Sequence, residues 1–207
     1  EPGVNLLWNP GFEQWHNPGA MCPSWDIVSG AFGTELKREE STVHGGSYAL
    51  QFIVASGGER NVTSSYVPVE PLKAYRVSAW IRGTNSGDTL EVKVLNFKKD
   101  RSSSSTATTS INTSTLGSAG AWIQRTGVIT TASDTRFIKL DFYSDDASGT
   151  LYMDDCIVSL EKPSFQAITP ATSAGGTGNA IAKDGLRDVF FTSDSHNYGG
   201  LFDRATG

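Results

Sequence analysis

The sequence predicts an all-β protein, more precisely a jelly-roll β-sandwich, on the basis of three observations. Hydrophobic and polar residues alternate with a period of two through most of the chain, whereas the 3.6-residue period of amphipathic helices is almost absent. Clusters of Gly, Ser, Asn and Asp separate the alternating segments at the spacing of short antiparallel strands. Glycine is abundant, with 22 residues in a chain of 207, as a fold with many tight turns requires.

Each alternating segment between two turn clusters is an expected strand. In chain order these segments are residues 4–8, 25–29, 33–39, 47–55, 63–69, 74–83, 88–98, 105–111, 121–130, 136–144 and 150–160. Strands at this spacing are typical of a sandwich or jelly roll. In three of them one side is wholly apolar and must face the core: Val77, Ala79 and Ile81, then Leu90, Val92 and Val94, then Ile138, Leu140 and Phe142. The Ser/Thr-rich stretch 102–118 is expected to contain an edge strand with flexible flanks.

The charge balance and the cysteine count exclude several classes of partner. The formal net charge is −5, so we expect no nucleic-acid footprint. No apolar run approaches the length of a membrane-spanning helix, so we expect no membrane insertion. The two cysteines, Cys22 and Cys156, lie far apart in the sequence and do not define a disulfide framework; whether they pair stays open.

Four short segments, taken in order, resemble the carbohydrate-binding modules of the family 4/9/16/22 type. They are Asn5-Leu6-Leu7-Trp8-Asn9-Pro10-Gly11-Phe12-Glu13, Pro23-Ser24-Trp25, His44-Gly45-Gly46-Ser47-Tyr48-Ala49-Leu50 and Leu151-Tyr152-Met153-Asp154-Asp155-Cys156-Ile157-Val158. The resemblance covers residues 4 to 161 and implies a galactose-binding-like jelly roll. It also implies core positions for Trp25 and Trp122 and, because relatives carry valine there, a buried hydrophobic role for Cys156. We expect Trp8 to be packed, while Trp15 could lie under a metal loop or at a rim.

After the module the amino-acid composition changes: large apolar residues become rare, and Gly, Thr and Ala dominate the next segment. We divide the chain into a module over 1–162, a Gly/Thr-rich linker over 163–185 and the start of a second β domain over 186–207. The final segment, Tyr198-Gly199-Gly200-Leu201-Phe202-Asp203-Arg204-Ala205-Thr206-Gly207, resembles the early strands of the C1q/tumour-necrosis-factor-like jelly roll and is too short to bury a core by itself. That resemblance implies a homotrimer, and modules of these two kinds in one chain resemble a phage tail fibre.

In the carbohydrate-binding modules that this sequence resembles, a structural calcium ion ties the first strand to the last. Ca²⁺ needs several hard oxygen ligands from carboxylates and carbonyls. The resemblance assigns Glu13 and Asp155 to this site, with Asp154 as a further candidate, and backbone carbonyls near residues 44–47 as the remaining ligands. The alternative is that these carboxylates cap turns or lie in solvent.

A sugar site combines a flat aromatic ring with charged groups that bond the hydroxyls. On the outward sides of strands 74–83, 88–98 and 136–144, the residues of these types are Trp80, Arg82, Glu91, Lys93, Asp141 and Tyr143, and we predict that they bind carbohydrate. The alternative is that a jelly roll distributes these strands between two sheets, so that the residues do not converge.

Catalysis finds little support in the sequence. His16, His44 and His196 show neither the spacing of zinc ligands nor a nucleophile partner. Glu39 and Glu40 are neighbours on a strand and point to opposite faces, so they cannot flank one bond. We therefore predict a non-catalytic glycan-binding module, extracellular or on a virion surface. The rivals are a structural spacer of a phage fibre or virion and an accessory domain of a secreted polysaccharide hydrolase.

Overall fold

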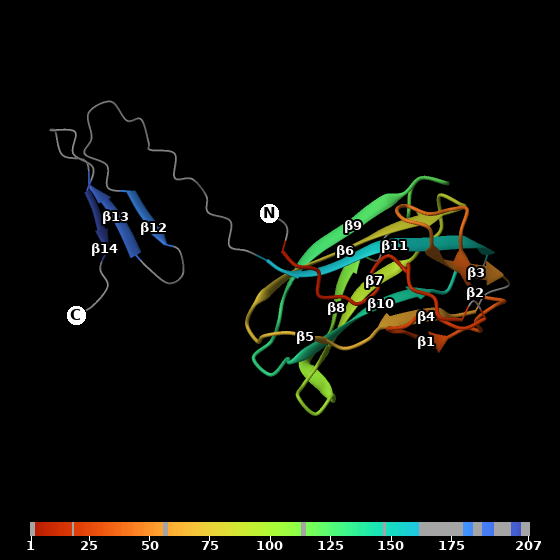
Figure 1. The fold of residues 1–207 in the computed structure, drawn as a ribbon, viewed down its shortest axis with the longest axis horizontal. Coiled ribbons are helices and arrows are strands. Elements are labelled where there is room, and N and C mark those ends of the chain that lie inside the picture. Colours follow the sequence, from red (N-terminus) through yellow and green to blue (C-terminus); the bar gives the residue numbers. More distant parts are fainter. Residues whose placement is uncertain are drawn as a thin grey trace. The chain divides into compact units, whose positions relative to one another are not determined.

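The computed structural model describes residues 3–17, 19–55, 58–112, 115–146 and 148–161, and three short strands beyond them. The chain divides into two compact units, Glu1–Glu161 and Lys162–Gly207. Every regular element in the described residues is a β-strand, which confirms the all-β prediction (Figure 1). In these residues no helix is long and apolar enough to cross a membrane.

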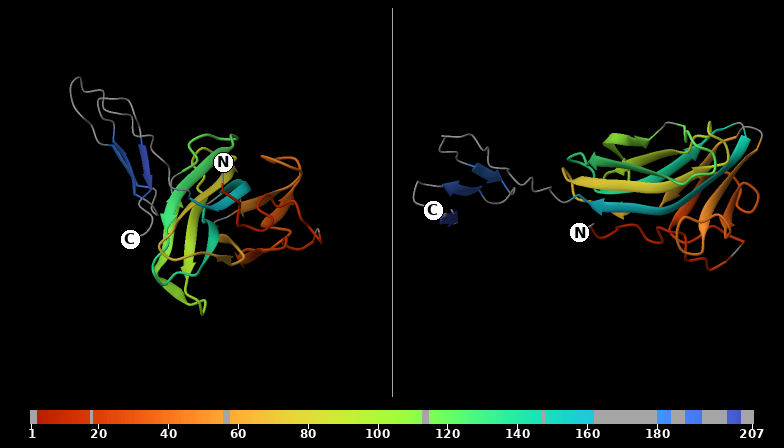
Figure 2. Two further views of the ribbon diagram at one scale, coloured as in Figure 1. Left: turned by 60° about the vertical axis from the view of Figure 1, so that its left-hand side comes forward. Right: turned by 90° about the horizontal axis from the view of Figure 1, so that it is seen from above.

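The first unit is a sandwich of two antiparallel sheets (Figures 1 and 2). The six-stranded sheet has the order β1 (Trp25–Ser29), β4 (Arg60–Ser64), β10 (Phe137–Ser144), β7 (Glu91–Phe97) and β8 (Ser103–Asn112), with β5 (Val67–Pro68) also paired to β10. The five-stranded sheet has the order β2 (Leu36–Glu39), β3 (Ala49–Ala55), β11 (Ser148–Leu160), β6 (Ala74–Gly83) and β9 (Ile123–Thr130). The Ser/Thr-rich β8 lies at an edge, as predicted.

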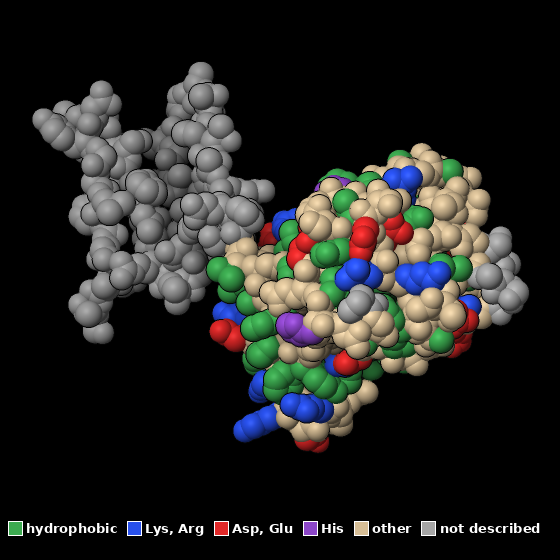
Figure 3. Space-filling model, turned by 45° about the vertical axis from the view of Figure 1, so that its right-hand side comes forward, with side chains coloured by type: hydrophobic (Ala, Val, Ile, Leu, Met, Phe, Trp, Pro, Cys, Tyr) green, Lys and Arg blue, Asp and Glu red, His purple; other side chains and the backbone are tan. Residues whose placement is uncertain are grey.

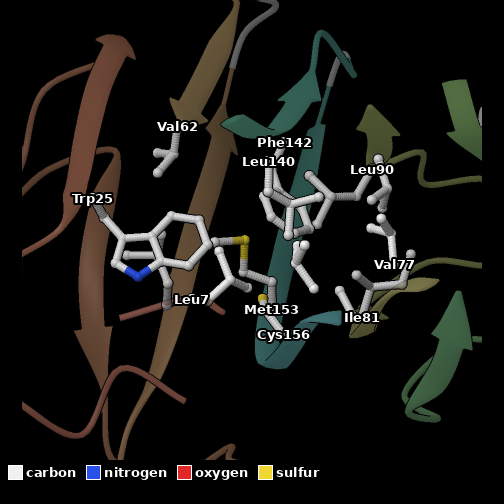
Figure 4. Close-up of a cluster of buried hydrophobic side chains, with 14 of the residues drawn as sticks. Leu7, Trp25, Val62, Val77, Ile81, Leu90, Leu140, Phe142, Met153 and Cys156 are labelled. Atoms are coloured by element: carbon white, nitrogen blue, oxygen red, sulfur yellow. The ribbon is translucent and has the colours of Figure 1, made fainter. Parts of the chain in front are cut away.

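The core lies between the two sheets and is filled by every second residue of each strand. The apolar sides predicted from β6, β7 and β10 are all buried there. At one end Trp25 packs against Phe12 and Phe142, with ring centroids 4.8 and 6.0 Å apart, and its indole N–H donates to the Asn9 carbonyl at 3.0 Å. Figure 4 shows Trp25, Phe142 and Met153 pointing into this interior. Cys22 and Cys156 are buried and unpaired.

Two of the predicted strands differ in the structure. Residues 4–8 form no strand, and the chain bends at Leu7 and Trp8. The Leu6 amide donates to the Val158 carbonyl at 2.7 Å, while the Asn5 side chain accepts from the Val158 amide and donates to the Cys156 carbonyl. The segment is therefore held to β11 by one backbone hydrogen bond and by the two bonds of the Asn5 side chain. The predicted strand 63–69 is two strands, β4 and β5, separated by Ser65 and Tyr66.

The tryptophans follow the sequence-based expectations only in part. Trp25 is buried, as predicted, and Trp15 is partly buried against Phe32. Trp8 is 66% exposed, because Leu7 is the residue of that segment that turns inward. Trp122 is not in the core either: it precedes β9 and packs on the outer side of the sheet, near His44 and Tyr152.

The second unit contains a three-stranded antiparallel sheet in the order β12 (Ala180–Lys183), β13 (Asp188–Thr192) and β14 (Gly200–Asp203). The strand β12 begins inside the segment 163–185 that the sequence analysis assigned to a linker. The remaining residues of that segment, and the turn residues of the C1q-like stretch, lie outside the described part of the chain.

Candidate functional site

The structure divides the six predicted sugar-binding residues between the two sheets. Trp80 and Arg82 lie on β6 of the five-stranded sheet, whereas Glu91 and Lys93 on β7 and Asp141 and Tyr143 on β10 belong to the six-stranded sheet. The expectation that Trp80 and Tyr143 share one outward face is therefore wrong. The physical reason is that β6 pairs with β9 and β11, while β7 pairs with β8 and β10.

The four residues on the six-stranded sheet form one constellation on its outer face. The antiparallel register of β7 and β10 places Lys93 opposite Asp141 and Glu91 opposite Tyr143. The Lys93 ammonium lies 4.6 Å from the centroid of the Tyr143 ring and forms a salt bridge with Glu91. A flat ring, a cation and two carboxylates are thus held together by strand pairing alone.

Burial sets the electrostatics of this constellation. It raises the pKa of Asp141, which is only 4% exposed, while a hydrogen bond from Asn61 and the charge of Lys93 oppose that rise. Partial burial and the carboxylates of Asp145 and Glu59 raise the pKa of Tyr143, whose hydroxyl donates to Glu59 at 3.3 Å. Asn61 Oδ1 is buried and has no hydrogen-bond partner among the described residues.

A second group of aromatic residues lies farther along the same face. Tyr66 packs edge-to-face on Phe97 and Phe137, with ring centroids 5.1 and 5.9 Å apart. The Lys139 ammonium and the Arg101 guanidinium lie 4.7 and 4.9 Å from the Tyr66 ring centroid. From this aromatic group to Tyr143 the face extends about 20 Å along β10, given the rise of a strand per residue.

Several residues of this face were missed by the sequence reasoning. The alternation in β7 and β10 places Phe97, Phe137 and Lys139 on the outward side, but nothing in the sequence singles them out. Asn61 was missed because the predicted strand began at 63, whereas β4 begins at Arg60. Tyr66 was missed because it lies in the break between β4 and β5.

Trp80 points outward, as predicted, but its ring is covered. The imidazole of His44 stacks on the indole at a centroid distance of 3.9 Å, and the Trp122 ring meets His44 edge-on at 5.6 Å. Arg82 lies 5.9 Å from the ring of Tyr152, its neighbour on β11. These side chains pack on one another rather than presenting an open platform.

The three predicted metal-binding carboxylates converge on the loop that precedes β3. Glu13 accepts the Ser47 amide at 3.0 Å and the Tyr48 amide at 3.2 Å. The Asp154 carboxylate accepts the backbone amides of His44, Gly45 and Asp155 at 2.9, 3.1 and 2.7 Å, while Asp155 pairs with the His44 ring at 2.7 Å. Burial raises the pKa of Asp154 to about 6.

Two glycines make this approach possible. A Cβ atom on Gly45 would lie 2.6 Å from Asp155 Oδ2, and one on Gly46 would overlap Glu13 Oε1. Among the described residues no three His, Cys, Asp or Glu side chains are arranged to hold a metal ion by themselves. Carboxylates from both ends of the module thus meet at the backbone of residues 44–48, where they accept amide groups.

Comparison with known proteins gives matches at the level of structure. No family model matches the sequence, and no curated protein matches it. A carbohydrate-binding module, TmCBM61, solved with β-1,4-galactotriose, superposes with a TM-score of 0.56 and 24% identity, over 76% of this chain and 99% of its own. The CBM22-1 xylan-binding domain of Paenibacillus barcinonensis Xyn10C superposes with a TM-score of 0.56 and 15% identity, over 79% and 99%.

A virion protein contains the same fold. The enzymatically active domain of bacteriophage CBA120 tailspike protein 4 superposes with a TM-score of 0.58 and 13% identity, over 76% of this chain and 22% of its own. At such identities the likeness concerns the fold alone: the first unit has the jelly-roll sandwich found in carbohydrate-binding modules.

Proposed function

We propose that the first unit is a non-catalytic glycan-binding module that binds along the outer face of the six-stranded sheet. The observation that supports this most directly is the constellation of Tyr143, Lys93, Glu91 and Asp141, in which a half-buried ring stands beside a cation and two carboxylates. Trp80 and Arg82, which lie on the other sheet, are not part of this proposed site.

The chemistry of the constellation suits a sugar. The apolar C–H side of a pyranose can pack on the edge or the face of the Tyr143 ring. Its hydroxyls can donate to the carboxylates of Glu91 and Asp141 and can accept from the Lys93 ammonium. Contacts of this kind give dissociation constants of roughly micromolar to millimolar for one module, and several copies in one assembly raise the effective affinity.

A matched pair of variants tests the proposal. The Lys93 ammonium lies 4.6 Å from the centroid of the Tyr143 ring. The Arg38 guanidinium lies at a similar distance, 4.8 Å, from the ring centroid of Tyr48, which is in the loop before β3. In a glycan-array screen followed by calorimetry, Tyr143→Ala should reduce binding of the selected glycan by about tenfold or more, and Tyr48→Ala should leave it unchanged. Equal losses in both variants, or none in either, would place the site elsewhere.

The absence of catalysis is part of the proposal and has its own test. Glu91 and Asp141 are carboxylates of the same face, but Glu91 is occupied by Lys93 and Asp141 by Asn61. We expect a bound oligosaccharide to keep its length on prolonged incubation, as measured by release of reducing ends. Because the tailspike domain with this fold belongs to an enzyme, appearance of new reducing ends would move the protein into that class.

We further propose that Glu13 and Asp155, with Asp154 as a possible additional ligand, hold a calcium ion with backbone carbonyls of residues 44–47. The support is the meeting of Glu13 and Asp155 at Gly45 and Gly46. A cation there would neutralise carboxylates from the N-terminal segment and from β11 and so tie the two ends of the module together.

The setting we propose is an extracellular or virion-surface fibre in which the chain forms a homotrimer through residues 186–207. The resemblance of that segment to the C1q-like fold supports this, as does the tailspike domain that shares the fold of the first unit. In such a fibre the first unit would bind host or environmental glycans. The competing role, a structural spacer, predicts a folded module that binds no glycan.

A further inference from the structure

A basic cleft lies at the end of the proposed glycan-binding face. The turn between β7 and β8, the yellow-green hairpin in Figure 1, meets the segment that leads into β10. Between them lies an open, shallow cleft of about 420 Å³ whose lining residues are Lys98, Lys99, Asp100, Asp134 and Arg136. Arg101 follows in the same turn, where its guanidinium lies over Tyr66.

The two carboxylates of the cleft are engaged by neighbouring hydroxyls and amides. Asp134 accepts from the Ser104 hydroxyl at 2.7 Å and from the hydroxyl and amide of Ser105 at 2.9 and 3.0 Å. These bonds hold the pKa of Asp134 at about 2. Asp100 accepts from the hydroxyl and amide of Ser102 at 2.7 and 3.0 Å, and its pKa is lowered too. Both acids therefore stay ionised, and the three basic and two acidic lining residues leave the cleft with a net charge of +1.

The basic side chains keep most of their donors free. Lys98 Nζ is 3.9 Å from Asp134, the outer limit of an ion pair, and Lys99 forms no salt bridge among the described residues. Arg136 uses one terminal nitrogen, Nη1, for the carbonyls of Ser133 and Thr135, both at 2.9 Å. Its other nitrogens remain for a partner. The cleft thus offers positive charge and donors to an anion.

The cleft is continuous with the glycan-binding face because strand pairing joins them. Phe97 and Phe137 are direct partners of β7 and β10, and the Arg136 amide donates to the Phe97 carbonyl at 2.8 Å. The far end of the same face is acidic, since Glu59, Glu91 and Asp145 surround Tyr143. The face therefore runs from an acidic end at Tyr143 to a basic end at the cleft.

We infer that the glycan bound on this face is acidic and places a carboxylate or a sulfate ester in the cleft of Lys98, Lys99 and Arg136. Neutral sugars of the same chain would lie along the face from the cleft towards Tyr143. A chain charged at every residue is disfavoured, because the acidic end of the face and the formal net charge of −5 repel it. Figure 3 shows one face of the molecule, on which basic and acidic side chains are scattered among uncharged ones. This inference rests on the proposed glycan-binding function.

Calorimetry with matched oligosaccharides tests the inference on the full chain. One pair is a xylo-oligosaccharide with and without a single glucuronate, and the other is β-1,4-galactotriose with and without a single sulfate ester. At about 20 mM salt, we expect at least one acidic member to bind about three- to tenfold more tightly than its neutral counterpart. The preference should disappear above about 0.5 M salt, where charges are screened. The two arms show whether carboxylate or sulfate is preferred.

Variants assign the preference to the cleft. Lys98→Gln/Lys99→Gln should reduce the ratio of acidic to neutral affinity to about one. Lys37→Gln/Lys73→Gln, an equal change of charge on β2 and in the turn before β6, should keep it. Equal binding of acidic and neutral members, or a preference that survives in the cleft variant, would overturn the inference and leave the proposed function standing. If neither pair binds and the glycan array also shows no bound glycan, both the inference and the proposed glycan-binding function are overturned.

Discussion

The imidazole of His44 lies flat on the indole of Trp80, with ring planes only 16° apart. His44 is held there because its backbone amide donates to Asp154 and its ring pairs with Asp155. The carboxylates of β11 thus fix a loop whose side chain covers the one tryptophan that β6 presents outward. A ring covered in this way contributes to packing rather than to ligand stacking.

Trp80→Ala is therefore expected to act on stability and not on glycan binding. Removing a half-buried indole that packs on His44 should lower the free energy of unfolding by about 1–3 kcal/mol. Urea unfolding measures this loss, and calorimetry of the folded variant should give the wild-type glycan affinity. A folded, stable Trp80→Ala protein that no longer binds would return the site to the five-stranded sheet.

Trp25 contributes to stability both through packing and through one hydrogen bond. Trp25→Ala should cost about 3–5 kcal/mol, the range for large aromatic residues in cores. Trp25→Phe keeps a ring between Phe12 and Phe142 but loses the bond to the Asn9 carbonyl, with a cost of about 1–2 kcal/mol from the unpaired acceptor. Denaturant midpoints of the two variants should differ in this order; similar midpoints would contradict the packing described for this end of the core.

Asp134 should make stability depend on pH in the acid range. Because its pKa in the folded protein, about 2, lies below the ordinary value of 3.8, its ionised form stabilises the fold above about pH 4. This stabilisation is lost as the pH falls towards 2. Asp134→Asn should thus melt at a lower temperature than the wild type at pH 7, and the difference should shrink below pH 4. A difference that stays constant across this range would show that the serine bonds do not favour the carboxylate.

Calcium binding can be tested by comparing variants of two acidic residues, Glu13 and Glu39, that contact the same loop. Glu13 accepts the amides of Ser47 and Tyr48, and Glu39 accepts those of Ser41 and Thr42. If Glu13 is a ligand, calcium at one hundred times its dissociation constant should stabilise the wild type by about 2.7 kcal/mol. Glu13→Gln should abolish this shift in melting temperature, whereas Glu39→Gln should retain it. A wild-type melting curve that chelator leaves unchanged would remove the metal from the proposal.

The proposed fibre setting predicts how the chain associates. The intact chain should form a homotrimer in light scattering at micromolar concentration, whereas a fragment ending at Glu161, the last residue of the first unit, should be a monomer. Trimers of both would place the contact in the sandwich instead of the C-terminal segment. A monomeric intact chain would contradict the fibre setting.

The sequence by itself determined which side of each strand is buried. Val77, Ala79 and Ile81 are all inside, and Trp80 between them is outside, because the side-chain period of a strand is a local property. The same local pattern placed Lys93 and Tyr143 on the outward sides of their strands. The approach of Glu13 to the loop at Gly46 followed from the resemblance to a known family, and the structure contains it.

Only the tertiary structure decided which outward sides belong together. Whether β6 or β10 lies beside β7 depends on pairing between segments far apart in the chain, and no local period encodes it. That pairing removed Trp80 from the site and brought Asn61 and Tyr66 into it. It also joined Lys98 to Arg136, which come from two different connections, in one basic cleft. The strand faces are consequences of short-range alternation, while the face proposed to bind glycan is a consequence of long-range strand order.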